Sequence, residues 1–156
     1  AVFDLGLLCK VEAGISTIHR SISVGRMIRE VMSSNLLLSR LQALRGCTEP
    51  VVINFTATRK ETGERWCPDC VAADPVIEEA AQKAPAGVYF LTVEIDRDEW
   101  KGASENYLRK APYSVRGIPT MLLWDTNAET STKRFGEEDL LQLELVSSFF
   151  EGLAEN

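Results

Sequence analysis

The residues best suited to chemistry are two cysteines three positions apart, in the stretch Trp66-Cys67-Pro68-Asp69-Cys70. At the start of a helix this spacing suits a reversible intramolecular disulfide, because free backbone N–H groups and the helix dipole favour a thiolate there. We expect Cys67 to be the more exposed thiol and the nucleophile. Cys70, about one turn further along, would attack a mixed disulfide and release the product. Pro68 and Asp69 lie between the thiols and would tune their redox behaviour.

Two other interpretations of the cysteine pair are half of a zinc site and a pair of inert core thiols. Zinc takes about four nitrogen or sulfur ligands. The remaining candidates, Cys9, Cys47 and His19, form no second close pair. A C-x-x-C indicates redox chemistry when it lies beside a βαβ pattern, and this chain has that pattern. We therefore favour a redox dithiol and expect no metal.

The βαβ pattern surrounds the cysteine pair. Residues 51–55 and 88–95 are nearly all apolar, so each predicts a strand that is buried on both faces, as in a parallel sheet. Between them the sequence predicts a helix that begins at about Pro68, with Pro75 expected to kink it. The cysteine pair therefore falls at a turn that leads into a helix between two central strands.

The other elements follow from apolar periodicity and turn residues. The sequence predicts a helix over 35–44, a polar loop over 56–65, an acidic loop over 96–102, a short helix over 104–110, strands over 121–124 and 130–135, and a helix over 137–153. The last helix carries apolar residues at i, i+4 spacing, which predicts packing in the core: Leu141, Leu145, Phe149 and Leu153.

Composition places the chain among ordinary globular proteins. Its 156 residues predict one domain, with 45% hydrophobic and 26% charged residues. The net charge of −6 argues against nucleic acid as a partner. No apolar run approaches the ~18 residues of a membrane span. Four scattered cysteines fit a reducing compartment better than a secreted disulfide scaffold.

With these elements in order, the chain resembles a thioredoxin. The matching features are the stretch 66–70, Pro75, and Gly117-Ile118-Pro119-Thr120 before an apolar strand. In that fold they are the redox turn, the kinked second helix and a cis-proline that faces the disulfide. The Pro-Asp middle pair and the long polar loop before the motif are similar to one branch of the superfamily, thioredoxin domain-containing protein 17.

The resemblance implies an α/β protein with a thioredoxin fold: a central mixed β-sheet flanked by helices, with an N-terminal extension. We expect residues 1–32 to be that extension and to be poorly ordered, apart from an edge strand at about residues 27–31. Residues 33–156 would form the thioredoxin-like domain. The resemblance also implies that Pro119 is cis, that Ile118 backbone groups pair with an extended substrate, and that Trp66 shields one side of the thiols.

The activity implied is that of a cytoplasmic protein-disulfide reductase, which acts on small or selected disulfides such as cystine. Thioredoxin reductase and NADPH would keep it reduced, and the chain itself would bind no cofactor. Dynein light chain is the protein partner that the resemblance suggests. The alternative is a non-catalytic adaptor whose acidic loop at residues 96–99 recruits a signalling or dynein light chain partner.

One residue departs from ordinary thioredoxins, which have a buried aspartate beneath the second cysteine. Asn54 occupies the matching place here. Asparagine cannot accept a proton as a base does, so resolution by Cys70 would use water or another group. The alternative is that Asn54 is a hydrogen-bonded polar residue of the core.

Overall fold

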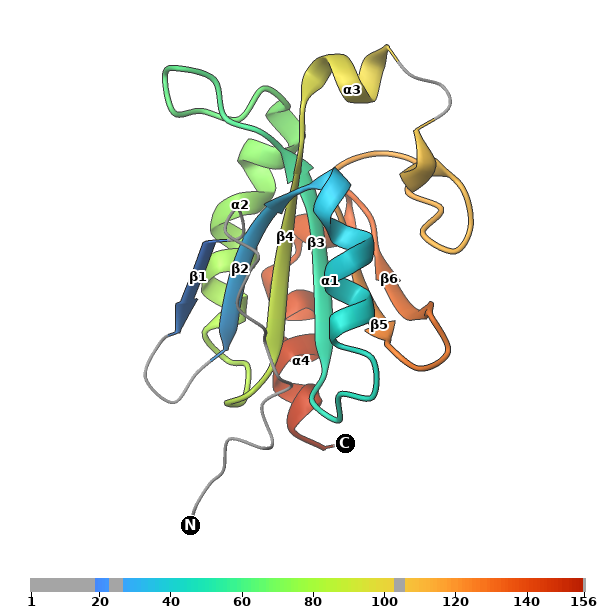
Figure 1. The fold of residues 1–156 in the computed structure, drawn as a ribbon. Coiled ribbons are helices and arrows are strands. Elements are labelled where there is room, and N and C mark those ends of the chain that lie inside the picture. The colour runs from blue at the N-terminus through green and yellow to red at the C-terminus, as the bar shows by residue number, and fades with distance from the viewer. Residues whose placement is uncertain (1–18, 23–26, 103–105, 156) are drawn as a thin grey trace.

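The computed structural model describes residues 19–22, 27–102 and 106–155. These residues form a six-stranded sheet in the order β1-β2-β4-β3-β5-β6, with helices on both faces (Figure 1). The strands are β1 (His19–Ile22), β2 (Ile28–Ser33), β3 (Val51–Ala57), β4 (Tyr89–Ile95), β5 (Thr120–Asp125) and β6 (Thr130–Phe135). The helices are α1 (Leu37–Ala43), α2 (Pro68–Ala81), α3 (Arg97–Lys101) and α4 (Leu143–Gly152).

The sheet is mixed, as the sequence predicts. Strand β4 pairs in parallel with β2 and β3, whereas β5 runs antiparallel to β3 and β6 antiparallel to β5. Every residue of β3 is buried, because helices cover both faces of this strand. The crossover from β3 through α2 to β4 is the predicted βαβ unit.

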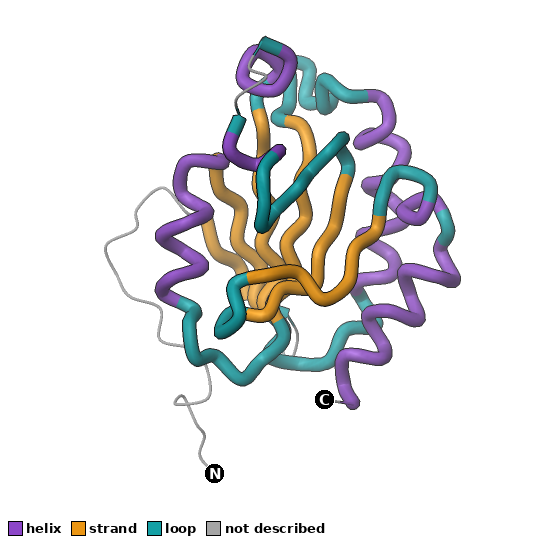
Figure 2. Tube along the Cα trace, turned by 90° about the vertical axis from the view of Figure 1, so that its right-hand side faces the viewer, coloured by secondary structure: helices purple, strands orange, loops and turns teal. Residues whose placement is uncertain are grey.

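Two apolar layers hold the helices to the sheet. Helix α1 lies on one face, and α2 and α4 lie together on the other (Figures 1 and 2). Beneath α2 and α4 the core contains Val52, Ile77, Val146 and Phe150, together with several alanines of α2. The small alanine side chains let α2 lie close to the sheet, which brings its first turn near the end of β3.

The final helix differs from its prediction. A short 3₁₀ turn precedes it, and α4 begins six residues later than the sequence analysis placed the helix. This delay changes which residues face the sheet. Leu141 and Leu145 are 50% and 39% exposed, whereas Val146 and Phe150 are buried. The predicted apolar stripe was therefore wrong for Leu141 and Leu145.

The acidic segment after β4 was predicted to be a loop and is mostly helix. Asp96 and Glu99 form a capping box at the start of α3. The Asp96 side chain accepts a hydrogen bond from the backbone N–H of Glu99, and the Glu99 side chain accepts one from the backbone N–H of Asp96. The D-x-x-E spacing is a helix-start signal that the sequence analysis overlooked. Of the short helix predicted over 104–110, the described part contains a single 3₁₀ turn at Tyr107–Arg109.

The N-terminal strands extend the sheet. Strand β2 begins within the segment that was assigned to the extension, and it lies between β1 and β4 rather than at the edge. A buried ion pair holds it to α1, because Arg40 donates from Nε and Nη2 to the carboxylate of Glu30 at 2.6 and 2.7 Å. We predicted that residues 1–32 are poorly ordered. Of these, residues 1–18 and 23–26 lie outside the described residues.

Candidate active site

The cysteine pair lies at the first turn of α2, beyond the carboxyl end of β3. Cys67 is the N-cap residue of α2, with an extended backbone (φ −104°, ψ 117°), and Pro68 is the first helical residue. Proline suits that position, because its missing N–H would have no partner inside the helix. The backbone N–H groups of Cys70 and Val71 both donate to the carbonyl of Cys67 at 3.1 Å. The Cys-Pro-x-Cys order itself therefore starts the helix between the two thiols.

The two thiols differ in burial. Both are free, and their residues are 8% (Cys67) and 0% (Cys70) exposed. Burial raises the pKa of Cys70 to about 12, and nearby Cys67 acts in the same direction. The Thr56 hydroxyl and the Ala57 backbone N–H partly offset this effect. At neutral pH the Cys70 thiol therefore stays protonated, and solvent reaches the pair only at Cys67.

A proline loop faces the thiols. The Ile118–Pro119 peptide bond is cis, as the resemblance implies, and both residues are buried at the start of β5. The Sγ atom of Cys67 lies 3.7 Å from the carbonyl oxygen of Ile118. A substrate held along this loop would therefore lie against Cys67 rather than Cys70.

Trp66 is anchored to the sheet and half-buried. Its indole Nε1 donates to the carbonyl of Ile95 at 2.8 Å, at the end of β4. The Nζ atom of Lys101 in α3 lies 6.0 Å from the centre of the Trp66 ring system. These two contacts hold the side chain at the end of β4, next to α3.

Arg65 connects three elements behind the motif, and sequence reasoning missed it. This buried guanidinium donates from Nε to Asp74 of α2 at 2.7 Å, and from Nη1 to the Ala57 carbonyl at 2.7 Å and to Glu94 of β4 at 3.1 Å. An arginine in a polar loop carries no periodic signal, and its partners lie far apart in sequence. The only hint was its position directly before Trp66.

The polar loop before the motif forms a narrow hairpin. Arg59 and Arg65 pair as an isolated bridge, and Lys60 N–H donates to the Glu64 carbonyl at 2.7 Å. Gly63 takes the left-handed conformation (φ +93°) that closes the turn. This hairpin and α3 rise beyond the same end of the sheet as the cysteine pair (Figure 1). Thr56, expected in the loop, belongs to β3 instead.

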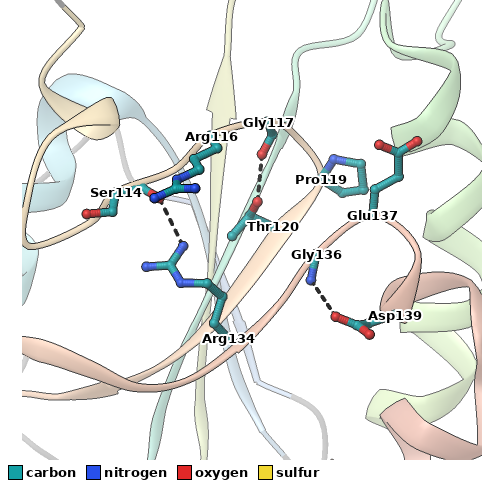
Figure 3. Close-up of a pocket in the computed structure, with 9 residues that line it drawn as sticks. All are labelled: Ser114, Arg116, Gly117, Pro119, Thr120, Arg134, Gly136, Glu137 and Asp139. Carbon is teal, nitrogen blue, oxygen red and sulfur yellow. Dashed lines mark hydrogen bonds between the residues drawn. The ribbon is translucent and has the colours of Figure 1, made fainter.

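A groove of about 540 Å³ begins at the cis-proline. Arg116 and Arg134 lie on one side of Pro119, and Glu137 lies on the other with its carboxylate directed toward α2 (Figure 3). A hydrogen bond with Asp69, and the negative charge of that residue, raise the pKa of Glu137. Glu137 therefore brings a second carboxyl group beside Asp69 of the motif.

Asn54 is buried in β3, and its Oδ1 atom has no hydrogen-bond partner among the described residues. The side chain is therefore not the fully hydrogen-bonded core residue of the alternative interpretation. Of the zinc candidates, Cys9 and the side chain of His19 lie outside the described residues. Within the described ranges, no group of three or more histidine, cysteine, aspartate or glutamate side chains could hold a metal ion. No helix there has the length and apolar character needed to cross a bilayer.

A cysteine pair at the first turn of α2, a cis-proline opposite it and a mixed sheet with helices on both faces define a thioredoxin-like oxidoreductase. Comparison with known proteins narrows this class. The chain belongs to the family described as thioredoxin domain-containing protein 17-like, whose thioredoxin-domain model matches residues 31–152.

Individual relatives agree with this assignment. Thioredoxin domain-containing protein 17 of Danio rerio is 31% identical over 97 residues, which cover 62% of this chain and 73% of that protein. A thioredoxin from Plasmodium falciparum superposes with a TM-score of 0.54 at 12% identity, over 85% of this chain and 94% of that one. A redox protein from Chlamydomonas reinhardtii gives a TM-score of 0.55 at 14% identity, over 87% of this chain and 38% of that one. The two structures support the fold alone.

Proposed function

We propose that this protein reduces small or selected disulfides through the Cys67–Cys70 dithiol. The observation that carries the proposal is the asymmetry of the pair: Cys67 is reachable beside the cis-proline, and Cys70 is wholly buried. The Cys67 thiolate attacks one sulfur of the substrate and expels the other as a thiol. The Cys70 thiolate then attacks Cys67 Sγ, forms the Cys67–Cys70 disulfide and releases the second thiol. Two electrons pass from the protein to the substrate.

The surroundings of the pair support a preference for small disulfides such as cystine. The hairpin over residues 58–65 and helix α3 stand beside the motif, so they limit the approach of a bulky protein. Asp69 and Glu137 place two carboxyl groups at the motif, which disfavours acidic protein surfaces on that side, whereas Arg116 and Arg134 line the other side of the groove.

The resting dithiol would be restored by thioredoxin reductase, with electrons from NADPH, in the cytoplasm. The protein needs no bound cofactor in this scheme, because the two sulfurs carry the electrons themselves. Dynein light chain is a further partner to test by direct binding.

The test is NADPH consumption in the presence of thioredoxin reductase and cystine. We expect wild-type protein to sustain turnover and Cys67→Ser to abolish it, since Cys70, the other free thiol of the described residues, is wholly buried. Cys70→Ser should instead accumulate mixed disulfides on Cys67, which mass spectrometry detects. Wild-type turnover by Cys67→Ser would refute the assignment. No turnover with both thiols intact would favour the non-catalytic adaptor.

A further inference from the structure

Thr56 is a buried hydroxyl without an ordinary partner. It is the sixth residue of β3, and it is 1% exposed. Its Oγ1 atom is shielded from solvent and makes no hydrogen bond within the described residues. Leaving a buried hydroxyl unpaired is unfavourable, because the group gives up its hydrogen bonds to water. This unpaired hydroxyl lies one residue before the end of β3, the strand that leads toward the cysteine pair. Its position there needs an explanation.

The hydroxyl lies close enough to Cys70 to lower the pKa of its thiol, as a donor to the thiolate form, although it makes no hydrogen bond with the protonated thiol. Ala57, the next residue of β3, presents its backbone N–H to the same sulfur. Arg65 fixes Ala57 in turn, through the 2.7 Å bond to the Ala57 carbonyl. The end of β3 therefore offers two donors to a sulfur that otherwise lies in apolar surroundings.

We propose that Thr56 is a catalytic residue for the second half of the reaction, in which its hydroxyl donates a hydrogen bond to the Cys70 thiolate. This inference rests on the proposed function. When Cys70 resolves the mixed disulfide, its proton passes to water and the thiolate attacks Cys67 Sγ. The new Cys67–Cys70 bond forms as the bond from Cys67 to the substrate sulfur breaks, and the substrate leaves as a thiolate. The hydroxyl stabilises the negative sulfur before the attack.

This role also accounts for Asn54. An aspartate at that position could take the Cys70 proton, and asparagine cannot. Lowering the free energy of the thiolate by hydrogen bonds is another way to make Cys70 reactive, with water as the proton acceptor. The hydroxyl then appears unpaired in the dithiol form because its partner is an anion that exists only during resolution.

The variant that isolates this role is Thr56→Val, which removes the hydroxyl and keeps the shape of the side chain. Reduced protein is mixed with 5,5′-dithiobis(2-nitrobenzoate) in a stopped-flow instrument. Attack by Cys67 releases one coloured thiolate at a rate that rises with reagent concentration. Resolution by Cys70 releases a second one at a rate independent of reagent concentration. The Cys67→Ser/Cys70→Ser double variant measures reaction at other thiols.

We expect Thr56→Val to slow the second release roughly 10- to 100-fold, the usual effect of a hydrogen bond to a charged group, and to leave the first unchanged. Thr56→Ser should restore most of the rate. Thr126→Val is the matched control, because Thr126 is also a buried threonine but follows β5 at the opposite end of the sheet. The melting temperature of Thr56→Val should not fall, since the change removes an unpaired buried hydroxyl.

Two results would overturn the inference: an unchanged second release in Thr56→Val, or an equal slowing of both releases together with a lower melting temperature. The second result would mean that Thr56 only supports the fold. A wild-type protein that releases a single thiolate would instead refute the dithiol mechanism itself, so the two failures are distinguishable.

Discussion

Cys70 lies in an environment that differs strongly from that of a free side chain. Its thiol is excluded from solvent, and burial raises its pKa from the ordinary 9.0 to about 12. This difference separates the roles of two chemically identical residues. In the proposed reaction the reachable Cys67 attacks first, and Cys70 reacts only with a sulfur that Cys67 has brought into the protein.

The raised pKa of Cys70 predicts how stability depends on pH. Above pH 9 the unfolded chain releases the Cys70 proton and the folded chain retains it, so alkali favours unfolding. The stabilisation from the protonated thiol is complete below pH 9 and is lost progressively toward pH 12. We expect the free energy of unfolding of the reduced protein, relative to Cys70→Ala, to fall by up to about 1.4 kcal/mol per pH unit in that window.

Urea denaturation of both proteins across this range gives the measurement. Burial also raises the pKa values of Tyr107 and Tyr113, but both proteins carry these tyrosines, so their contribution cancels in the difference. A difference that stays constant with pH would contradict the assignment of a buried, protonated Cys70.

At the scale of elements, Arg65 joins the ends of β3 and β4 to α2. Replacing it by methionine leaves Asp74 and Glu94 without their cation and the Ala57 carbonyl without its donor. Asp74 and Glu94 are partly exposed, so the loss should be smaller than for a fully buried pair, about 2–3 kcal/mol. Urea denaturation measures this loss directly.

Arg59 provides the matched control for Arg65. It lies in the same hairpin and is exposed, and its guanidinium donates to the Gly63 carbonyl. Arg59→Met should therefore change the free energy of unfolding by less than about 0.5 kcal/mol. Equal small effects of the two substitutions would show that the Arg65 network does not hold the elements together.

The elements also show where sequence reasoning succeeds. The strands β3 and β4 were predictable because buried parallel strands are apolar at every position, and α2 because Pro68 marks a helix start. The first residue of α4 was not predictable. The 3₁₀ turn before the helix changes which apolar residues face the sheet, but it leaves their spacing in the sequence unchanged. Helix α3 was predictable in principle from Asp96 and Glu99.

The candidate site divides in the same way. The motif and Pro119 could be identified because their chemistry is local in sequence. Arg65 and Thr56 could not, since their roles depend on partners that only the folded sheet brings near. The sequence shows that Thr56 is a polar residue at the end of an apolar strand, but it does not show that the residue lies near Cys70.

At the scale of the whole molecule, the buried Glu30–Arg40 pair attaches the N-terminal strands to the rest of the domain. Removing one charge of a buried pair leaves the other uncompensated, which costs about 3–5 kcal/mol. We expect that loss for Glu30→Gln in thermal or urea unfolding. Glu78→Gln, which breaks an exposed pair with Arg29 of β2, should cost less than about 1 kcal/mol. Similar losses for both variants would mean that β2 contributes little to the stability of the sheet.

The burial of Cys70 has a consequence for damage by oxidants. A peroxide that approaches from solvent meets Cys67, while Cys70 stays out of reach. Oxidation of Cys67 to a sulfenic acid leaves an intact thiol one helical turn away. The two condense to the disulfide with loss of water, before a second oxidant molecule can carry Cys67 to an irreversible acid. The burial that raises the pKa of Cys70 thus also protects its thiol from oxidants, so that it remains available to convert oxidised Cys67 to the disulfide.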